Sequence, residues 1–451
     1  MRGTFLVTVA VLATATTAAH ALPAQNPRLV AIPSNTAIDL GRYGCESPAG
    51  EGGHCENITD YSGMVHDPHT HRLFMFGGGH AGTSGTIRSD VSAFDFTTLT
   101  WSSDYAPTSC GDMKVGNIDT TNGAWTSTKQ PLARHTYDML VMLDDPPEML
   151  LATSGAVSGE TCSGGPAPAG FALQTRIAGY APTTRKWTYR KTDPGQWDSF
   201  SAAELDPVSG ATMILGSYGL WAYDAKADAF LGSQFDPTEL GYANNLVYAR
   251  KADRMYYFAR GAATRVFELA LDRAAWTHST LTELTSVVGP ASPETGYAYD
   301  DVNDVVGGGI VDGQFTAFDP ATRSWTTLAM RTDPPGGTIG TLAFHEIAFD
   351  PVDGVFLFIT DVVSGYHVWA YRFAGAPPSP PANVPGGATS GPVDAGASSA
   401  ASPAAPTSGC ATVPTTSVGD TAALALAVTF LGWRRRLSKR ERERDVRDGH
   451  V

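Results

Sequence analysis

A pair of short apolar strands joined by an Asp-containing turn recurs six times along the chain. The copies occupy residues 61–78, 135–155, 199–217, 241–261, 295–309 and 343–361. A third strand, a polar turn and an aromatic residue follow the first five copies, at 92–101, 176–187, 220–230, 266–276 and 315–325. Units of four antiparallel strands at intervals of about 40 to 75 residues are typical of a β-propeller. The repeat therefore predicts an all-β fold with six blades.

The sixth unit lacks its own fourth strand. It supplies a third strand at 367–375 and then runs into a segment of different composition. Residues 35–41 (NTAIDLG), just before the first unit, can fill the gap and close the ring. Closure would remove two unpaired sheet edges. A seventh blade in the long insertion 102–131, which carries Trp125, is the alternative.

The first unit, HDPHTHRLFMFGGGH…DVSAFDFTTLTW, resembles a kelch repeat, with its paired glycines and closing tryptophan. The kelch tryptophan position holds Trp101, Trp187, Trp276 and Trp325, with Phe230 in the third unit. The glycine pair is clear at 77–78 and 307–308, degraded at 154–155, 216–217 and 260–261, and absent at 360–361. This resemblance, which covers roughly 60–375, implies a propeller like the central domain of galactose oxidase. It implies no particular activity, because propellers host unrelated functions.

The two ends of the chain have the composition of targeting segments. Residues 1–21 combine Arg2, an apolar run and a small-residue cleavage site, which predicts a secretory signal peptide. The propeller is expected over 22–376. Residues 377–408 are rich in Pro, Ala, Ser and Gly and cannot bury a core, which predicts a disordered linker.

The segment 409–451 contains Cys410, a short apolar run and three arginines, Arg434, Arg435 and Arg436. This order resembles the MYXO-CTERM sorting signals of exported myxobacterial proteins, although the charged extension after Lys439 is longer than usual. An ordinary weak C-terminal anchor is the alternative, since the apolar run is short of the roughly 20 residues that span a bilayer. We expect export, with the tail engaging the membrane or sorting machinery, and either surface tethering or secretion after processing.

Export makes the five cysteines candidates for disulfides. Cys45 and Cys55 close a short loop, and Cys110 and Cys162 both lie in Gly/Ser/Pro-rich insertions. We predict these two pairs and expect Cys410 to be lipidated, cleaved away or free.

The formal charge of −14 disfavours nucleic acid and anionic lipid surfaces as partners. We therefore expect an extracellular glycan or protein partner, no nucleic acid and a monomeric chain.

Candidate site residues gather on one predicted face. In a four-stranded blade, the loops between strands two and three lie on the same side as the connections into the next blade. This face also receives the long insertions 81–90, 102–131 and 156–169, and such loops commonly form binding sites. The candidates are His80, Arg134, His135, Tyr137, Tyr242, Asn244, Arg260, Tyr297, His345 and Glu346, with Tyr105 and Trp125 as aromatic contacts.

Two functions fit this face. The first is non-enzymatic binding of a glycan or an extracellular protein, with Trp125, Tyr105 and Tyr242 stacking on sugar rings or anchoring a partner. The second is β-elimination on a uronic-acid polysaccharide, or its hydrolysis, by His80, Arg134, His135 and Tyr137. An Arg or Asn would neutralise the sugar carboxylate while His or Tyr moves the proton. The resemblance to propeller lyases such as ulvan lyases extends only to the fold. His135 and Tyr137 can equally be strand residues bonded within the central channel.

Metal, phosphate and copper sites receive little support. The cluster His66, Asp67, His69 and His71 lies on a short hairpin, where we expect the imidazoles to splay apart and Asp67 to serve the turn. The glycines at 77–79 lack the Lys-Ser/Thr of a phosphate loop. No Tyr/Cys placement matches a galactose-oxidase copper centre. We therefore expect neither a metal nor a cofactor.

Overall fold

The computed structural model describes residues 23–43, 62–77, 89–109, 111–134, 136–152, 176–190, 202–216, 219–234, 244–291, 294–362 and 365–375. The expected signal peptide, linker and sorting segment lie outside these residues, as do all five cysteines. Predictions about export, disulfides and the tail therefore stay predictions. Within the described part of the chain, no helix is long and apolar enough to cross a bilayer.

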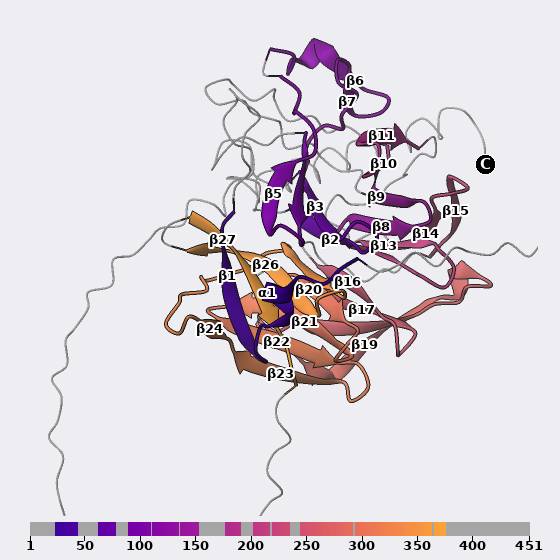
Figure 1. Cartoon of the computed structure of the whole chain (residues 1–451). Coiled ribbons are helices and arrows are strands. Elements are labelled where there is room, and N and C mark those ends of the chain that lie inside the picture. Colours follow the sequence, from indigo (N-terminus) through magenta and orange to yellow (C-terminus); the bar gives the residue numbers. More distant parts are fainter. Residues whose placement is uncertain are drawn as a thin grey trace, which may run out of the picture. The chain divides into compact units, whose positions relative to one another are not determined.

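The described residues form a six-bladed β-propeller, as the repeat predicts (Figure 1). The first three blades are β2 (Gly63–Asp67), β3 (Arg72–Phe76), β4 (Val91–Asp95), β5 (Thr100–Ser103); β8 (Leu140–Asp144), β9 (Pro147–Leu151), β10 (Ala178–Ala181), β11 (Lys186–Tyr189); and β12 (Ala202–Leu205), β13 (Thr212–Gly216), β14 (Gly219–Asp224), β15 (Ala229–Gln234). The last three are β16 (Asn245–Ala249), β17 (Arg254–Ala259), β18 (Arg265–Ala270), β19 (Thr280–Val288); β20 (Tyr297–Asp300), β21 (Val305–Val311), β22 (Gln314–Asp319), β23 (Ser324–Ala329); and β25 (Ile347–Asp350), β26 (Val355–Val362), β27 (Gly365–Arg372) with β1 (Thr36–Arg42). The first strands of the blades contact one another in a closed circle and so surround the axis.

The N-terminal strand β1 closes the ring, as expected from residues 35–41. It pairs antiparallel with β27, and Figure 1 shows the two strands side by side. A short strand, β24 (Arg331–Asp333), pairs in parallel with the other edge of β1. The guanidinium of Arg372 in β27 donates to the carbonyls of Leu29 and Ile32, around the short helix α1 (Pro27–Val30). The ring is thus held at its junction by both strand pairing and this arginine.

The turn between the first two strands has the same chemistry in blades 1, 3, 5 and 6. A buried aspartate begins it and accepts a hydrogen bond from the backbone N–H two residues later; these residues are Asp67, Asp206, Asp300 and Asp350. The turn ends on a residue with positive φ, namely His71, Gly210, Asp304 and Gly354. The prediction that Asp67 serves the turn is confirmed.

Gly77 and Gly308 allow a chain that enters a blade to pass very close; it is the next blade for Gly77 and the same blade for Gly308. A Cβ atom on Gly77, where φ is +75°, would lie 2.1 Å from the carbonyl oxygen of Arg134. A Cβ atom on Gly308, where φ is +149°, would lie 2.2 Å from the carbonyl oxygen of Gly296. Any side chain at these two positions would force the backbones apart.

The insertion 102–131 does not form a seventh blade in its described part. It contains the 3₁₀ turn η2 (Val115–Asn117) and a two-stranded hairpin of β6 (Ile118–Asp119) and β7 (Ala124–Trp125). Trp125 packs with Met113 and Leu132 and is buried in this small cluster. A second 3₁₀ turn, η3 (Trp276–His278), precedes β19, so Trp276 lies just outside the fourth strand of its blade.

Candidate functional site

A cavity of about 220 Å³ lies on the axis of the propeller. All six innermost strands contribute to its wall, from Met64 in β2 to Ile347 in β25. The turn residues Pro207, Arg250 and Pro351 also line it and are exposed. The mouth of the cavity therefore lies on the face of these turns, opposite the face that receives the long insertions. Sequence reasoning placed the site on the other face.

The wall of the cavity is acidic. Its carboxyl groups belong to Asp138, Asp144, Glu204 and Asp301, against the guanidinium of Arg250. Asp138 Oδ2 accepts a hydrogen bond of 2.6 Å from the N–H of Leu246, and Glu204 accepts one of 2.8 Å from its neighbour's N–H.

Burial in this wall changes the protonation of two of these carboxyl groups. It raises the pKa of Glu204 to about 7. Burial also raises the pKa of Asp138 well above its usual range, and the nearby charge of Glu204 adds to that rise. Glu204 can therefore exchange a proton near neutral pH, as a general acid or base must.

Side chains from three alternate blades meet at the other end of the axis. The rings of Tyr137 (blade 2) and His345 (blade 6) stand edge to face, with centroids 5.5 Å apart. His345 Nδ1 lies 3.3 Å from Oδ1 of Asn245 (blade 4), whose amide also donates to Thr295. All three side chains are buried. Within the described residues these contacts lie where three innermost strands begin, toward the long-insertion face, and we define Tyr137, Asn245 and His345 as the axial plug.

The structure brings several predicted site residues together around this plug. Burial, with the charge of Arg260, lowers the pKa of His345 to about 3, so its imidazole is neutral. Arg260 also forms an ion pair with Glu294 through its guanidinium. Its backbone N–H donates a hydrogen bond of 3.0 Å to Oδ1 of Asn244. Sequence reasoning found this group because each member lies where the chain enters a blade or leaves a second strand.

Other predicted residues are buried or lie elsewhere. Arg134 is fully buried, with Nε donating to the carbonyl of Leu132, and Glu346 is 1% exposed. Tyr297 stacks on Phe258.

The two aromatic residues proposed to contact sugar are engaged within the protein. Tyr105 donates to Ser89 and accepts from Trp187, away from the axis, and Trp125 belongs to the buried cluster of the insertion. His80, His135 and Tyr242 lie outside the described residues. The binding and catalytic roles of all these residues stay predictions.

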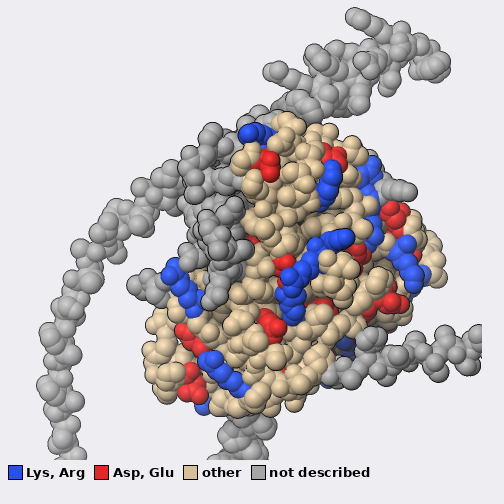
Figure 2. Space-filling view, turned by 45° about the horizontal axis from the view of Figure 1, so that its top comes forward, with Lys and Arg blue, Asp and Glu red and all other residues tan. Residues whose placement is uncertain are grey.

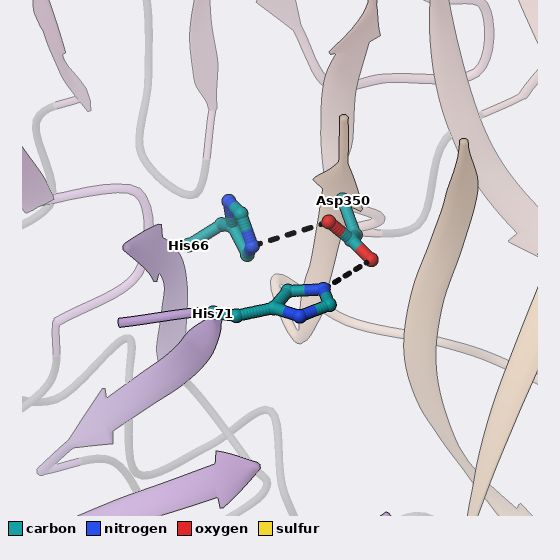
Figure 3. Close-up of side chains that lie close together, drawn as sticks. All are labelled: His66, His71 and Asp350. Carbon is teal, nitrogen blue, oxygen red and sulfur yellow. Dashed lines mark hydrogen bonds and ion pairs between the residues drawn. The ribbon is translucent and has the colours of Figure 1, made fainter. Parts of the chain in front are cut away.

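Two imidazoles converge where blade 6 meets blade 1 (Figure 3). His66 Nε2 lies 3.3 Å from Asp350 Oδ1, and His71 Nε2 lies 3.1 Å from Asp350 Oδ2. The expectation that the three histidines splay apart is therefore wrong for this pair. It fails because Asp350, far away in sequence, faces both rings, while His69 turns toward Asp144, 4.0 Å away.

Burial affects the two imidazoles of this junction differently. It lowers the pKa of His66 to about 4. For His71, burial acts in the same direction, but the hydrogen bond and charge of Asp350 outweigh it and raise the pKa overall.

No protein-family model and no curated protein matches the sequence. Solved structures with a similar arrangement include an auxiliary nutrient-binding protein from Bacteroides ovatus, with 11% identity, a TM-score of 0.44, and coverage of 77% of this chain and 75% of that one. An oligogalacturonate lyase in complex with manganese has 11% identity, a TM-score of 0.36 and coverage of 69% and 77%. The hydrazine synthase of Kuenenia stuttgartiensis has 9% identity, a TM-score of 0.37 and coverage of 69% and 77%. Likeness at this level concerns the fold alone, and the fold that the described residues show is a six-bladed β-propeller.

Proposed function

We propose that this protein binds a neutral or amino-sugar unit of an extracellular glycan, which enters the axial cavity from the turn face. The observation that carries the proposal is the acidic, partly aromatic cavity enclosed by all six blades. Its volume of about 220 Å³ is below the roughly 300–1,000 Å³ of pockets for drug-sized ligands. A single sugar residue, or the end of a chain, is an occupant of suitable size.

The cavity wall offers the groups that sugar hydroxyls need. Carboxyl groups accept hydrogen bonds from hydroxyls, and the guanidinium of Arg250 donates to them. The rings of Tyr248 and Tyr299 add apolar surface to the wall, while their hydroxyl groups donate to Asp253 and Asp304. Rings held in this way provide a preformed surface for the apolar face of a sugar.

The charge of the cavity argues against a polyanionic ligand. Four carboxyl groups face one guanidinium in its wall, and even with the raised pKa values of Asp138 and Glu204 the wall has no excess of positive charge that would attract a uronate carboxylate. On the molecular face shown in Figure 2, basic and acidic side chains are interspersed over a largely uncharged surface. The elimination alternative has weaker support, because Arg134 and Tyr137, two of its four catalytic residues, are buried. Binding therefore fits these observations better than cleavage of a uronic-acid polymer.

Isothermal titration calorimetry with a panel of neutral, amino and uronic sugars and oligosaccharides tests the proposal. We expect binding of neutral or amino sugars and at least about a tenfold loss of affinity in Glu204→Gln and Arg250→Ala, as for loss of hydrogen bonds to charged groups. Glu283→Gln is the matched control. Glu283 lies on β19, the outermost strand of blade 4, and pairs there with Arg265 of β18. Sugar binding that survives both cavity variants would contradict the axial site. New unsaturated products from uronic polymers would favour the elimination alternative.

A further inference from the structure

The junction of blades 6 and 1 departs from the repeated turn at two positions. In blades 1, 3 and 5 the fourth turn residue donates a side-chain hydrogen bond to the first aspartate of its turn. The donors are Thr70 to Asp67, Ser209 to Asp206 and Asn303 to Asp300. Blade 6 has Asp353 at this position. Two buried carboxyl groups, Asp350 and Asp353, therefore stand together in that turn.

The second departure is in blade 1. The last turn residue, which adopts positive φ, is Gly210 in blade 3, Asp304 in blade 5 and Gly354 in blade 6, but it is His71, with a bulky ring, in blade 1. A histidine at φ +52° is less favourable than a glycine, because its Cβ crowds the backbone. The side chain is nevertheless 1% exposed and faces the carboxyl groups of blade 6. Both exceptions to the repeat thus face each other across the ring closure.

The donor atoms at this junction have the separation that a metal ion requires. Nε2 of His66, Nε2 of His71 and a carboxylate oxygen of Asp350 all lie within 4.8 Å of one another. Tetrahedral zinc with bonds of about 2.0–2.1 Å places its ligand atoms about 3.3 Å apart. The two oxygens of Asp350 serve one imidazole each: Oδ1 lies 3.3 Å from His66 Nε2 and Oδ2 lies 3.1 Å from His71 Nε2. Asp353 Oδ2 lies 3.5 Å from His71 Nε2.

Three polar atoms of the cluster lack hydrogen bonds although they are buried. They are Nε2 of His66, Nδ1 of His71 and Oδ2 of Asp353, none of which has a hydrogen-bond partner within the described residues. Buried polar atoms without such partners are uncommon in native proteins and point to an ion or water between them. Figure 3 shows both imidazoles directed at the carboxylate of Asp350, which belongs to the adjacent blade.

We propose that His66, His71 and Asp350, with Asp353 as a further oxygen donor, bind a divalent transition-metal ion of the zinc type. Two imidazoles with carboxylate oxygens suit Zn²⁺ and its neighbours better than Mg²⁺ or Ca²⁺, which prefer oxygen ligands alone. The ion would join blade 6 to blade 1. His66 also lines the axial cavity. This site does not depend on the proposed glycan binding.

The repeat itself supplies conservative variants for the test. His71→Gly installs the residue of the equivalent positions Gly210 and Gly354, so the turn can form without the imidazole. Asp353→Asn installs the residue found at Asn303, which donates to its own turn aspartate. His66→Ala removes a ligand from the cavity wall. His69→Ala is the matched control, because it changes the same hairpin outside the cluster.

The experiment uses the untagged chain, stripped with a chelator, titrated with Zn²⁺ by calorimetry and with Co²⁺ by visible absorption. We expect one Zn²⁺ per chain at a site that His66→Ala and His71→Gly weaken more than about tenfold and His69→Ala leaves unchanged. Co²⁺ should show the intense visible bands of a tetrahedral site, absent in His66→Ala. Circular dichroism before titration verifies that each variant is folded.

Two results would overturn the inference. The folded wild-type chain could bind no Zn²⁺ below millimolar concentrations, which would make the cluster an ion-pair lock between blades. Alternatively, His66→Ala and Asp353→Asn could both bind Zn²⁺ like the wild type, which would place the ion elsewhere.

Discussion

The ring of Tyr137 stands edge-on to the imidazole of His345, although the two residues lead into blades that are not adjacent. The contact therefore crosses the axis of the propeller, and Asn245 joins it from a third blade. Tyr137 adopts a φ of +40°, a conformation that a bulky residue rarely takes. Its surroundings hold it there, which is typical of positions that have a structural or functional role.

Truncation of the axial plug should destabilise the ring. Tyr137→Ala removes a buried aromatic side chain, and we expect a loss of about 3 kcal/mol in the free energy of unfolding. Tyr137→Phe keeps the ring and should cost less than about 1.5 kcal/mol. Urea denaturation of both variants measures the difference. Equal losses would show that the hydroxyl group, and not ring packing across the axis, dominates.

A comparison of Gly77 with Gly210 distinguishes the two reasons for a glycine, which are a positive φ and the close approach of another backbone segment. Both have a φ of +75°, but an added Cβ meets the Arg134 carbonyl oxygen at 2.1 Å in the first case and nothing within 4 Å in the second. Gly210→Ala should cost only the conformational penalty of about 1–2 kcal/mol. Gly77→Ala should cost clearly more, because two blades must move apart. Thermal unfolding of the pair measures this, and similar melting temperatures would refute the close-approach argument.

Glu204 should make the protein less stable as pH rises. Its pKa is 4.5 in the reference state and about 7 when folded, so between these values only the folded state keeps the proton. Stability from this group is complete at low pH, falls between about pH 4.5 and 7, and is constant above that range. Glu204→Gln lacks this dependence, so its stability relative to the wild type should be greater at pH 8 than at pH 5.

Denaturation of both proteins at the two pH values provides the check. Asp138, whose pKa is raised mainly by burial, contributes to the slope in both proteins, and it contributes less in Glu204→Gln because the charge of Glu204 adds to that rise. Both effects act in the same direction, so the comparison keeps its sign. An unchanged difference between pH 5 and pH 8 would mean that Glu204 is already ionised in the folded protein.

Strand β1 should be essential for ring closure. Ala37 is fully buried in β1 and pairs with Tyr371 on one side and Thr332 on the other. Ala37→Pro removes a backbone donor and adds a ring inside the sheet, so we expect a loss of 3 kcal/mol or more, about the cost in a regular element. Removal of residues 377–451, the predicted linker and tail, is the control and should leave the melting temperature unchanged. Differential scanning calorimetry of both proteins tests the contrast.

Much of the fold could be predicted from local patterns. The positions of the strands, the six units, the turn aspartates and the closing strand at 35–41 all follow from residues close together in sequence. Alternation of apolar residues and turn chemistry are local constraints, so the hairpins of each repeat can be predicted from the sequence of that repeat alone. The glycines at Gly77 and Gly308 also appear in the repeat, although the reason for them, a neighbouring backbone, does not.

The sequence by itself determined that the chain repeats a four-stranded unit and how its ring closes. Only the tertiary structure decided that the cavity opens on the turn face, and that His66 and His71 face an aspartate 279 residues from His71. Two signals were present in the sequence: His71 at a turn position that holds Gly or Asp in blades 3, 5 and 6, and Asp353 in place of Ser, Thr or Asn. Neither signal indicates its partner in the structure. Closure of the ring brings the first and last blades together, and local sequence patterns cannot predict contacts between residues so far apart in the chain.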